Sequence, residues 1–238
     1  MNGQSATIQV DGARLDGDLA IPSNATGVVL FAHGSGSSRH SPRNRQVAQV
    51  LQDSGLATLL IDLLTREEEK ADRATGELRF DIAFLAERLE FATGWLRDHE
   101  ATSGLAVGYF GASTGAAAAL VAAARTPAAD AVVSRGGRPD LAEHALGHVK
   151  APTLLIVGGR DHQVIEMNES ALARLNCEKH MEIVEGATHL FEEPGALDDV
   201  TSLARDWFLR YLAARRCTTS SDRWGTAPLS VLKRRTER

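Results

Sequence analysis

The sequence is poor in several residue types, and each shortage excludes a class of protein. It has two cysteines, Cys177 and Cys217, in 238 residues, which is too few for a disulfide framework and fits a reducing compartment. No cysteine and histidine spacing typical of a zinc site occurs, so we expect no metal. No apolar run reaches the length of a transmembrane helix, and the first residues lack the basic and apolar regions of a signal peptide. These absences predict a soluble, cytoplasmic protein.

The charge balance and the length exclude further classes. The formal net charge of −5 gives no global attraction to nucleic acid or to an anionic membrane, so neither is an expected partner. The apolar fraction of 43% is slightly below the soluble average, which argues against a disordered chain and against a membrane protein. A chain of 238 residues can bury the core of one α/β domain.

Predicted strands and helices alternate along most of the chain. Residues 7–10 and 13–21 alternate apolar and polar around Asp11-Gly12, which predicts an edge hairpin. Further predicted strands cover residues 27–32, 56–61, 105–110, 130–134, 152–157 and 181–184, and predicted helices cover residues 42–54, 81–99, 116–124, 140–148, 166–175 and 197–214. The alternation indicates an α/β fold with a mostly parallel sheet and helices on both faces. No repeat or second core is visible, so residues 1–214 are predicted to form a single domain.

Two polar segments fall outside this alternation. Residues 67–79 are strongly charged, which favours a solvated excursion, and the alternative is a lid over a pocket at the carboxyl edge of the sheet. Residues 215–238 are rich in serine and threonine and end in a basic cluster. They predict a mobile tail, and contact with nucleic acid or acidic partners is the weaker alternative for it.

The stretch Gly111-Ala112-Ser113-Thr114-Gly115 joins a predicted strand to an alanine-rich helix. A serine at the apex of such a turn projects its hydroxyl from the edge of the sheet, beside a helix N-terminus. The flanking glycines let the strand and helix backbones pass closely. The pattern alone also occurs in ordinary loops, but its strand and helix neighbours favour Ser113 as a nucleophile.

A serine hydroxyl needs a base within reach and a third group that orients the base. Asp161 and His189 each lie in a loop directly after a predicted strand, and the carboxyl ends of parallel strands meet where ligands bind. The alternatives are a turn role for Asp161 and a structural role for His189. Their position and the chain order Ser, Asp, His favour Asp161 as the orienting acid and His189 as the base. The neighbouring His162 is expected to be exposed.

Such a nucleophile also needs donors for the oxyanion of the tetrahedral intermediate. One predicted donor is the backbone N–H of Thr114. The other is expected in the loop His33-Gly34-Ser35-Gly36, with the Ser35 N–H first and Gly36 next. A phosphate-cradle interpretation of this loop is weaker because the G-x-x-x-x-G-K-[ST] spacing is missing. His33 is expected to shape the loop.

Four short motifs occur in the order HGSGS, GASTG, GGRD and GATH. Together they resemble the motifs of the α/β-hydrolase superfamily, and the resemblance covers residues 13–214. The size, the lack of a large inserted cap and the GATHLFEEPG ending are similar to the dienelactone-hydrolase-like branch. This resemblance implies an α/β-hydrolase fold with about eight strands, no cofactor, and hydrolysis of esters or lactones. Dienelactone hydrolases proper use a cysteine nucleophile. Ser113 therefore puts dienelactone in doubt and favours a carboxylesterase.

Arginines crowd the predicted active edge of the sheet. They are Arg39, Arg43, Arg45, Arg135, Arg138 and Arg160. An arginine fork suits a carboxylate or phosphate, although each arginine taken singly is more often a solvated charge. Arg135 and Arg138, which follow a predicted strand, are the best candidates to bind an anionic group of the substrate, and Arg39 is the next.

The sequence therefore predicts a serine hydrolase that cleaves small carboxylic esters or lactones through Ser113, His189 and Asp161. A non-catalytic binding or scaffold protein on a hydrolase core is the alternative from another class. Acyl transfer, C–C bond hydrolysis and peptidase activity stay open, because a fold does not fix a function. The expected partner is a small-molecule substrate, and the oligomeric state is left open.

Overall fold

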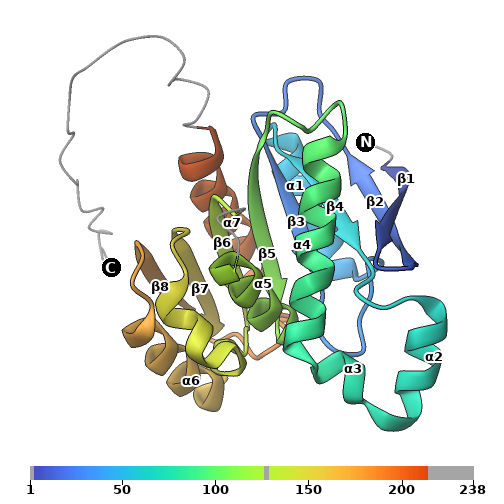
Figure 1. The fold of residues 1–238 in the computed structure, drawn as a ribbon. Coiled ribbons are helices and arrows are strands. Elements are labelled where there is room, and N and C mark those ends of the chain that lie inside the picture. The colour runs from blue at the N-terminus through green and yellow to red at the C-terminus, as the bar shows by residue number, and fades with distance from the viewer. Residues whose placement is uncertain (1–2, 126–128, 214–238) are drawn as a thin grey trace.

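Eight strands form one sheet in the computed structural model, which describes residues 3–125 and 129–213 (Figure 1). The strands are β1 (Gln4–Val10), β2 (Ala13–Ala20), β3 (Gly27–Ala32), β4 (Ala57–Ile61), β5 (Ala106–Ala112), β6 (Ala131–Arg135), β7 (Thr153–Gly158) and β8 (Lys179–Val184). Their order across the sheet is β1-β2-β4-β3-β5-β6-β7-β8. The mostly parallel sheet of an α/β-hydrolase fold is confirmed.

The hairpin at one edge is the antiparallel part of the sheet. β1 pairs with β2, and β2 pairs with β4, both antiparallel. The turn between β1 and β2 is possible because Gly12 adopts a φ of 77°, which a residue without Cβ reaches at little cost. The six strands β4, β3, β5, β6, β7 and β8 run parallel to one another, so their carboxyl ends meet at one edge.

Helices cover both faces of the sheet (Figure 1). They are α1 (Pro42–Asp53), α2 (Arg66–Thr75), α3 (Glu77–Phe80), α4 (Ile82–Asp98), α5 (Thr114–Arg125), the 3₁₀ helix η1 (Pro139–His148), α6 (His162–Arg174) and α7 (Ala196–Leu212). One core cluster packs α4, α5, η1 and α6 against one face, and a second packs α1 and α7 against the other. The inner strands β3, β4, β6 and β7 are buried along their whole length, as expected for strands covered on both faces.

The charged segment 67–79 folds into α2 and α3 beyond the end of β4 (Figure 1). Thr65 and Glu68 form a capping box at the start of α2, which satisfies two N–H groups that the helix leaves unpaired. Glu68 also pairs with the buried Arg88 of α4 at 2.6 Å. Asp72, at the other end of α2, is buried and pairs with Arg79 at 2.5 Å. The segment is therefore a mostly exposed helical excursion that the Glu68–Arg88 pair anchors to α4.

Two boundaries differ from the sequence prediction in ways that affect the site. α6 begins at His162 rather than at residue 166, because Asp161 stands at its N-cap position. β6 includes Arg135 as its last residue, so this arginine lies in the sheet rather than in the loop after it. The predicted tail at residues 215–238 lies outside the described residues.

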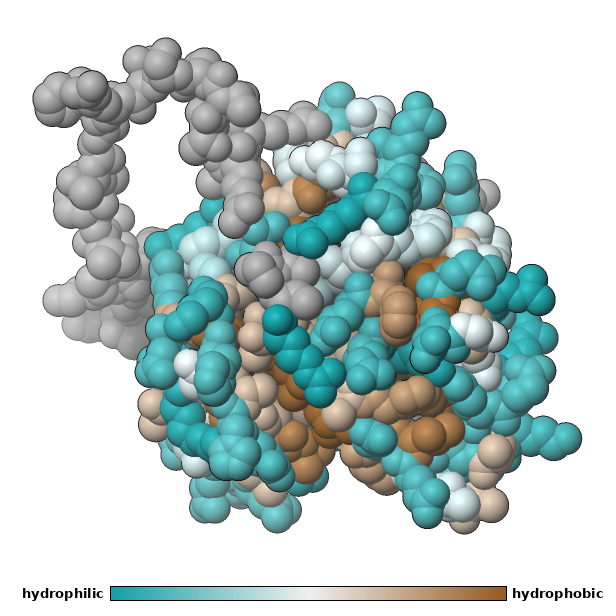
Figure 2. All heavy atoms as spheres, in the orientation of Figure 1, coloured by the Kyte–Doolittle hydropathy of each residue, from teal (hydrophilic) through white to brown (hydrophobic). Residues whose placement is uncertain are grey.

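Polar residues dominate the visible surface of the molecule. Figure 2 shows hydrophilic residues over most of this face, and apolar residues gather in its lower part, the side on which α2 and α3 lie in Figure 1. Within the part of the chain that the structure describes, no helix has the length and apolar character needed to cross a membrane.

Candidate active site

The turn between β5 and α5 has the geometry of a strained strand-to-helix elbow. Ser113, at its apex, has a φ of 51°, which is uncommon for a residue with a Cβ. Glycines are required on both sides. A Cβ on Gly111 would lie 2.4 Å from the Ala116 Cα, and one on Gly115 would lie 2.3 Å from the Ala32 carbonyl oxygen. The strain persists because the packing around the turn leaves no other path, and it presents the serine at the edge of the sheet.

Asp161 and His189 meet at the carboxyl ends of β7 and β8. The His189 Nδ1 lies 2.6 Å from the Asp161 Oδ2. The His189 side chain is 39% exposed and the Asp161 side chain is 17% exposed, so water screens the pair only partly. With Nδ1 held by the carboxylate, the other ring nitrogen, Nε2, is the one left to accept a proton. His162, by contrast, is exposed, as predicted.

The backbone brings Ser113 and His189 to the same place. The Ser113 N–H donates to the Arg135 carbonyl at 3.3 Å. The next residue, Gly136, packs against His189: a Cβ there would lie 3.1 Å from the His189 carbonyl oxygen and 3.6 Å from its Cε1. No hydrogen bond joins the Ser113 hydroxyl to His189 among the described residues. Such contacts often close only when substrate binds.

Two residues that the sequence analysis missed hold the His189 loop. Glu193 accepts a hydrogen bond from the Thr188 N–H at 3.0 Å, and this bond lowers the pKa of the Glu193 carboxyl. Phe191 has a φ of 55° and is buried in the core cluster beneath α7. The EEPG segment and an aromatic residue after the histidine were visible in the sequence, but their partners depend on how the loop folds back.

The predicted oxyanion loop lies against the elbow. A Cβ on Gly34 would lie 3.0 Å from the Ser113 Cβ, so glycine allows this approach without a shift of the elbow. The Ser35 N–H donates to the Thr114 hydroxyl at 2.9 Å. Thr114 is the first residue of α5, so its own N–H has no acceptor within the helix. Gly36 has a φ of 71° and turns the loop at this point.

His33 fixes the shape of this loop. Its Nδ1 lies 2.9 Å from the Gly34 carbonyl oxygen, and its Nε2 lies 3.1 Å from the Leu63 backbone nitrogen. Since the N–H of Leu63 can only donate, Nε2 accepts and Nδ1 carries the proton. Burial lowers the pKa of His33, which keeps the ring neutral. Both nitrogens are engaged, so His33 has none left for proton transfer to a substrate.

A cavity of about 210 Å³ lies between the oxyanion loop and α2. Its walls include Gly34, Ser35, Leu63, Leu85 and Thr114, and its rim carries charged residues of α2. The cavity adjoins the elbow through Thr114 and Gly34, next to Ser113. The α2–α3 segment therefore forms one wall of a pocket at the carboxyl edge of the sheet.

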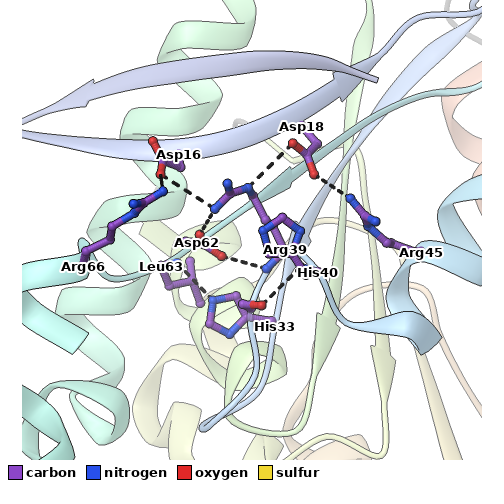
Figure 3. A network of polar contacts seen from close by, with 10 residues as sticks. Asp16, Asp18, His33, Arg39, His40, Arg45, Asp62, Leu63 and Arg66 are labelled. Atoms are coloured by element: carbon purple, nitrogen blue, oxygen red, sulfur yellow. Dashed lines mark hydrogen bonds and ion pairs between the residues drawn. The ribbon is translucent and has the colours of Figure 1, made fainter. Parts of the chain in front are cut away.

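Two of the predicted substrate-binding arginines are already paired with carboxylates. Figure 3 shows Arg39 between Asp16, Asp18 and Asp62. Its backbone N–H also donates to Asp62 at 2.7 Å, which ties the oxyanion loop to the end of β4.

Arg138 is paired as well: it makes two hydrogen bonds to Asp140, at 2.9 and 2.7 Å, and the bonds to this carboxylate raise the pKa of the guanidinium. Arg135 differs from both. It is 8% exposed and lies near Asn44 of α1 rather than near an acid.

The comparisons with known proteins agree with the fold. The Dienelactone hydrolase family model matches residues 15–213. A crystal structure of a dienelactone hydrolase from Anabaena variabilis is 62% identical in sequence and has a TM-score of 0.86, over 89% of this chain and all of that chain. Est1E from Butyrivibrio proteoclasticus shares the fold at 15% identity and a TM-score of 0.73, over 87% of this chain and 98% of that chain.

Two longer relatives carry a different name. Two Mycobacterium tuberculosis chains, provisionally named phosphoribosyl transferases, are 60% identical to this chain over 198 residues. The match covers 82% of this chain but 44% of those relatives. The similarity therefore reaches less than half of each longer protein.

Proposed function

The chain belongs to the dienelactone hydrolase family, and we propose that it is a hydrolase that cleaves small carboxylic esters or lactones with Ser113 as the nucleophile. The observation that carries this proposal is the 2.6 Å contact between His189 and Asp161 beside a strained serine elbow. A base oriented by an acid, next to a half-buried serine, is the arrangement that nucleophilic acyl chemistry requires.

In the first half of the reaction, the Ser113 Oγ attacks the carbonyl carbon of the ester while His189 Nε2 takes its proton. The tetrahedral intermediate then collapses, and the bond to the leaving oxygen breaks. His189 gives the proton to that oxygen, which departs as an alcohol, or stays attached as a hydroxyl if the substrate is a lactone. Asp161 keeps the imidazole in the useful tautomer and stabilises its cation.

In the second half, water attacks the acyl group on Ser113. His189 takes a proton from this water and returns it to the Ser113 oxygen as the acid leaves. Neither half needs a metal or a cofactor.

The negative charge of each tetrahedral intermediate falls on the carbonyl oxygen. The Thr114 N–H is the first proposed donor, because it has no acceptor within α5, and the helix N-terminus adds a positive dipole. The Ser35 N–H is the second. It donates to the Thr114 hydroxyl at 2.9 Å, so it must exchange this acceptor for the oxyanion. Gly36 is the alternative donor.

The nucleophile and the cavity limit the substrate. Ser113 forms an oxygen ester with the acyl group, and we propose ordinary small esters and lactones rather than dienelactone itself. The cavity of about 210 Å³ beside Thr114 has room for a group of a few carbon atoms. We place one side of the substrate there, against Leu63 and Leu85.

The test is hydrolysis of 4-nitrophenyl acetate by the wild type and by Ser113→Ala. We expect turnover with an acyl-enzyme burst in the wild type, and a rate at least about 10³-fold lower in the variant. Activity that survives the substitution would remove Ser113 from its role. If the wild type neither turned over a panel of small esters nor was phosphonylated by a fluorophosphonate, the binding-protein alternative would replace the proposal.

We do not extend the transferase name of the mycobacterial relatives to this chain. The chain spans 44% of their length, and its described residues already form a hydrolase fold with an elbow and an acid–base pair. We propose that the name describes the part of those proteins that this chain does not match. Acyl transfer, C–C bond hydrolysis and peptide hydrolysis are distinguished by the same Ser113 variant with the corresponding substrates.

A further inference from the structure

Two arginines beside the candidate active site have buried N–H groups without acceptors. The Nε and Nη1 of Arg135 are shielded from water and have no hydrogen-bond partner, and the same holds for the Nε of Arg43. The remaining nitrogen of Arg135, Nη2, reaches only the neutral Asn44 side chain at 3.4 Å. Buried donors in proteins are normally paired, so three unmet donors on two neighbouring guanidinium groups call for an explanation.

The two arginines lie where three parts of the site meet. Arg135 is the last residue of β6, and its carbonyl accepts the Ser113 N–H. Arg43 is in the first turn of α1 and donates to Glu192 at 2.8 Å. Glu192 is three residues after His189 in the chain. Both guanidinium groups are therefore attached to segments that carry or contact the proposed nucleophile and base.

The burial of Arg135 without a counter-charge is costly. It is 8% exposed, and no carboxylate lies within ion-pair distance of it among the described residues. A buried charge without a partner strongly destabilises a protein. Burial, with repulsion from Arg43 second, lowers the pKa of Arg135 to about 10, so it is still a cation at neutral pH. Among the described residues the other buried arginine is Arg88, whose Nη1 is also unpaired, but it has the Glu68 carboxylate as a counter-charge at 2.6 Å.

Arg43 and Arg135 together carry two positive charges, and within the described part of the chain only one carboxylate, that of Glu192, pairs with them. Arg43 has Glu192 as a partner, but the Glu192 side chain is 63% exposed, and exposed pairs of this kind are weak and exchange readily. The α1 N-terminus adds a positive dipole at the same point. In its first turn Pro42 has no N–H, and the Asn44 N–H donates to the Ser41 hydroxyl.

We propose that Arg43 and Arg135 form an anion site beside Ser113 that takes an oxyanion group of the substrate, either a carboxylate or a phosphate. Two oxygens of such a group match the parallel N–H donors of a guanidinium fork. Its role toward substrate rests on the proposed ester hydrolysis. The site differs from the sequence prediction, since Arg39 and Arg138 are already paired and Arg43 takes their place.

The first experiment compares three phenyl acetates that differ in one para substituent: methyl 4-acetoxybenzoate, 4-acetoxybenzoate and 4-acetoxyphenyl phosphate. The measured quantity is the ratio of kcat/KM for each anionic ester to that for the neutral one. We expect this ratio to fall at least tenfold in both Arg43→Gln and Arg135→Met. The anion with the larger fall identifies the group that the site prefers.

Arg45→Gln is the matched control. Arg45 lies on the same helix, two residues beyond Arg43, and pairs with Asp18 at 3.1 Å, away from the two arginines of the site. The ratio of kcat/KM values measured for Arg45→Gln should equal that of the wild type. An unchanged ratio in both Arg43→Gln and Arg135→Met would overturn the proposal. Arg43→Gln keeps the test valid even if the substitution in β6 prevents folding.

A second measurement separates the anion site from ester hydrolysis. Sodium phosphate and sodium acetate are titrated into the wild type and the variants by calorimetry. Binding that weakens at least tenfold in Arg43→Gln or Arg135→Met, but not in Arg45→Gln, supports the site even if none of the esters is cleaved. Absence of binding to the wild type, together with equal rates for neutral and anionic esters, would contradict it.

Discussion

At the scale of single residues, the arginines of this chain show why charge patterns alone do not locate a binding group. In the sequence, Arg39, Arg135 and Arg138 were three cations near the active edge, of which Arg135 and Arg138 were preferred because they follow a predicted strand. The structure distinguishes them by their partners: Arg39 and Arg138 have carboxylates, and Arg135 has an amide. Those partners come from residues close in space, and only in Arg138 from a residue close in the sequence, so the pattern could not show which of the three have acidic partners.

Replacement of Arg135 by methionine should stabilise the protein. Methionine fills a similar volume without a buried charge, so we expect the free energy of unfolding to rise by about 1 to 4 kcal/mol. Urea denaturation at pH 7 measures it. Arg45→Met, at an exposed position, should stay within about 0.5 kcal/mol of the wild type. A loss of stability in Arg135→Met would show that the guanidinium has a favourable partner in the folded protein.

His33 should make stability depend on pH. Its pKa is lowered by burial, so below about pH 6.5 the unfolded chain binds a proton that the folded chain excludes. Stability from this group is fully present above that pH and is lost as the pH falls toward the folded pKa, with a slope of up to about 1.4 kcal/mol per pH unit.

The measurement is the slope of the free energy of unfolding between pH 7 and pH 5. The slope should be smaller in His33→Gln, which has no titrating ring at this position. His162→Gln is the control, because His162 is exposed and its replacement should leave the slope unchanged. An identical slope in His33→Gln would show that the ring titrates normally.

At the scale of elements, the segment α2–α3 is one that the pattern of apolar and polar residues did not predict as helical. Its residues are polar on all sides, and no apolar stripe marks the helix. The helix is held instead by the capping box at Thr65 and by the long-range pair between Glu68 and Arg88. The capping box could be identified from the sequence, but the pair with α4 could not, because it joins residues that are 20 positions apart.

The Glu68–Arg88 pair should be the main anchor of α2. Glu68→Gln keeps a side chain that can complete the capping box, but it leaves the buried Arg88 without a counter-charge. We expect the free energy of unfolding to fall by about 3 kcal/mol, the lower end for a buried pair, since Glu68 is partly exposed. Hydrogen exchange should show faster exchange in α2 than in α4.

Glu67→Gln tests the specificity of this effect. Glu67 lies on the same helix turn and is exposed, so its replacement should change stability by less than about 1 kcal/mol. If the two variants were equally stable, the pair would contribute nothing beyond an ordinary surface charge. If Glu68→Gln also raises KM for small esters, α2 is needed to shape the cavity.

At the scale of the whole molecule, the sequence was sufficient for the order of elements and for the edge at which the site lies. Alternating strands and helices imply parallel strands whose carboxyl ends meet, and Ser113, Asp161 and His189 all follow strand ends. The sequence could not show how closely helices approach the sheet, because that distance depends on pairs of residues far apart. Gly108 of β5 is such a case, since Phe208 of α7 packs directly on it.

A side chain at Gly108 should disturb the packing of the last helix on the centre of the sheet. A Cβ there would lie 2.6 Å from Phe208 Cε1 and 3.0 Å from Leu212 Cδ1. We expect Gly108→Ala to lower the free energy of unfolding by about 1 to 3 kcal/mol. Gly94→Ala is the counterpart: Gly94 lies within α4 with nothing within 4 Å of the added Cβ, so stability should rise by about 1 kcal/mol. Equal effects of the two substitutions would refute this account.

The anchoring of the His189 loop by Phe191 ties the proposed general base to the same core cluster that holds α7 to the sheet. A base supported in this way is expected to keep its position for as long as this core cluster stays packed. Heat should therefore abolish hydrolysis and tertiary structure over one temperature range, so thermal inactivation of this protein measures its global unfolding.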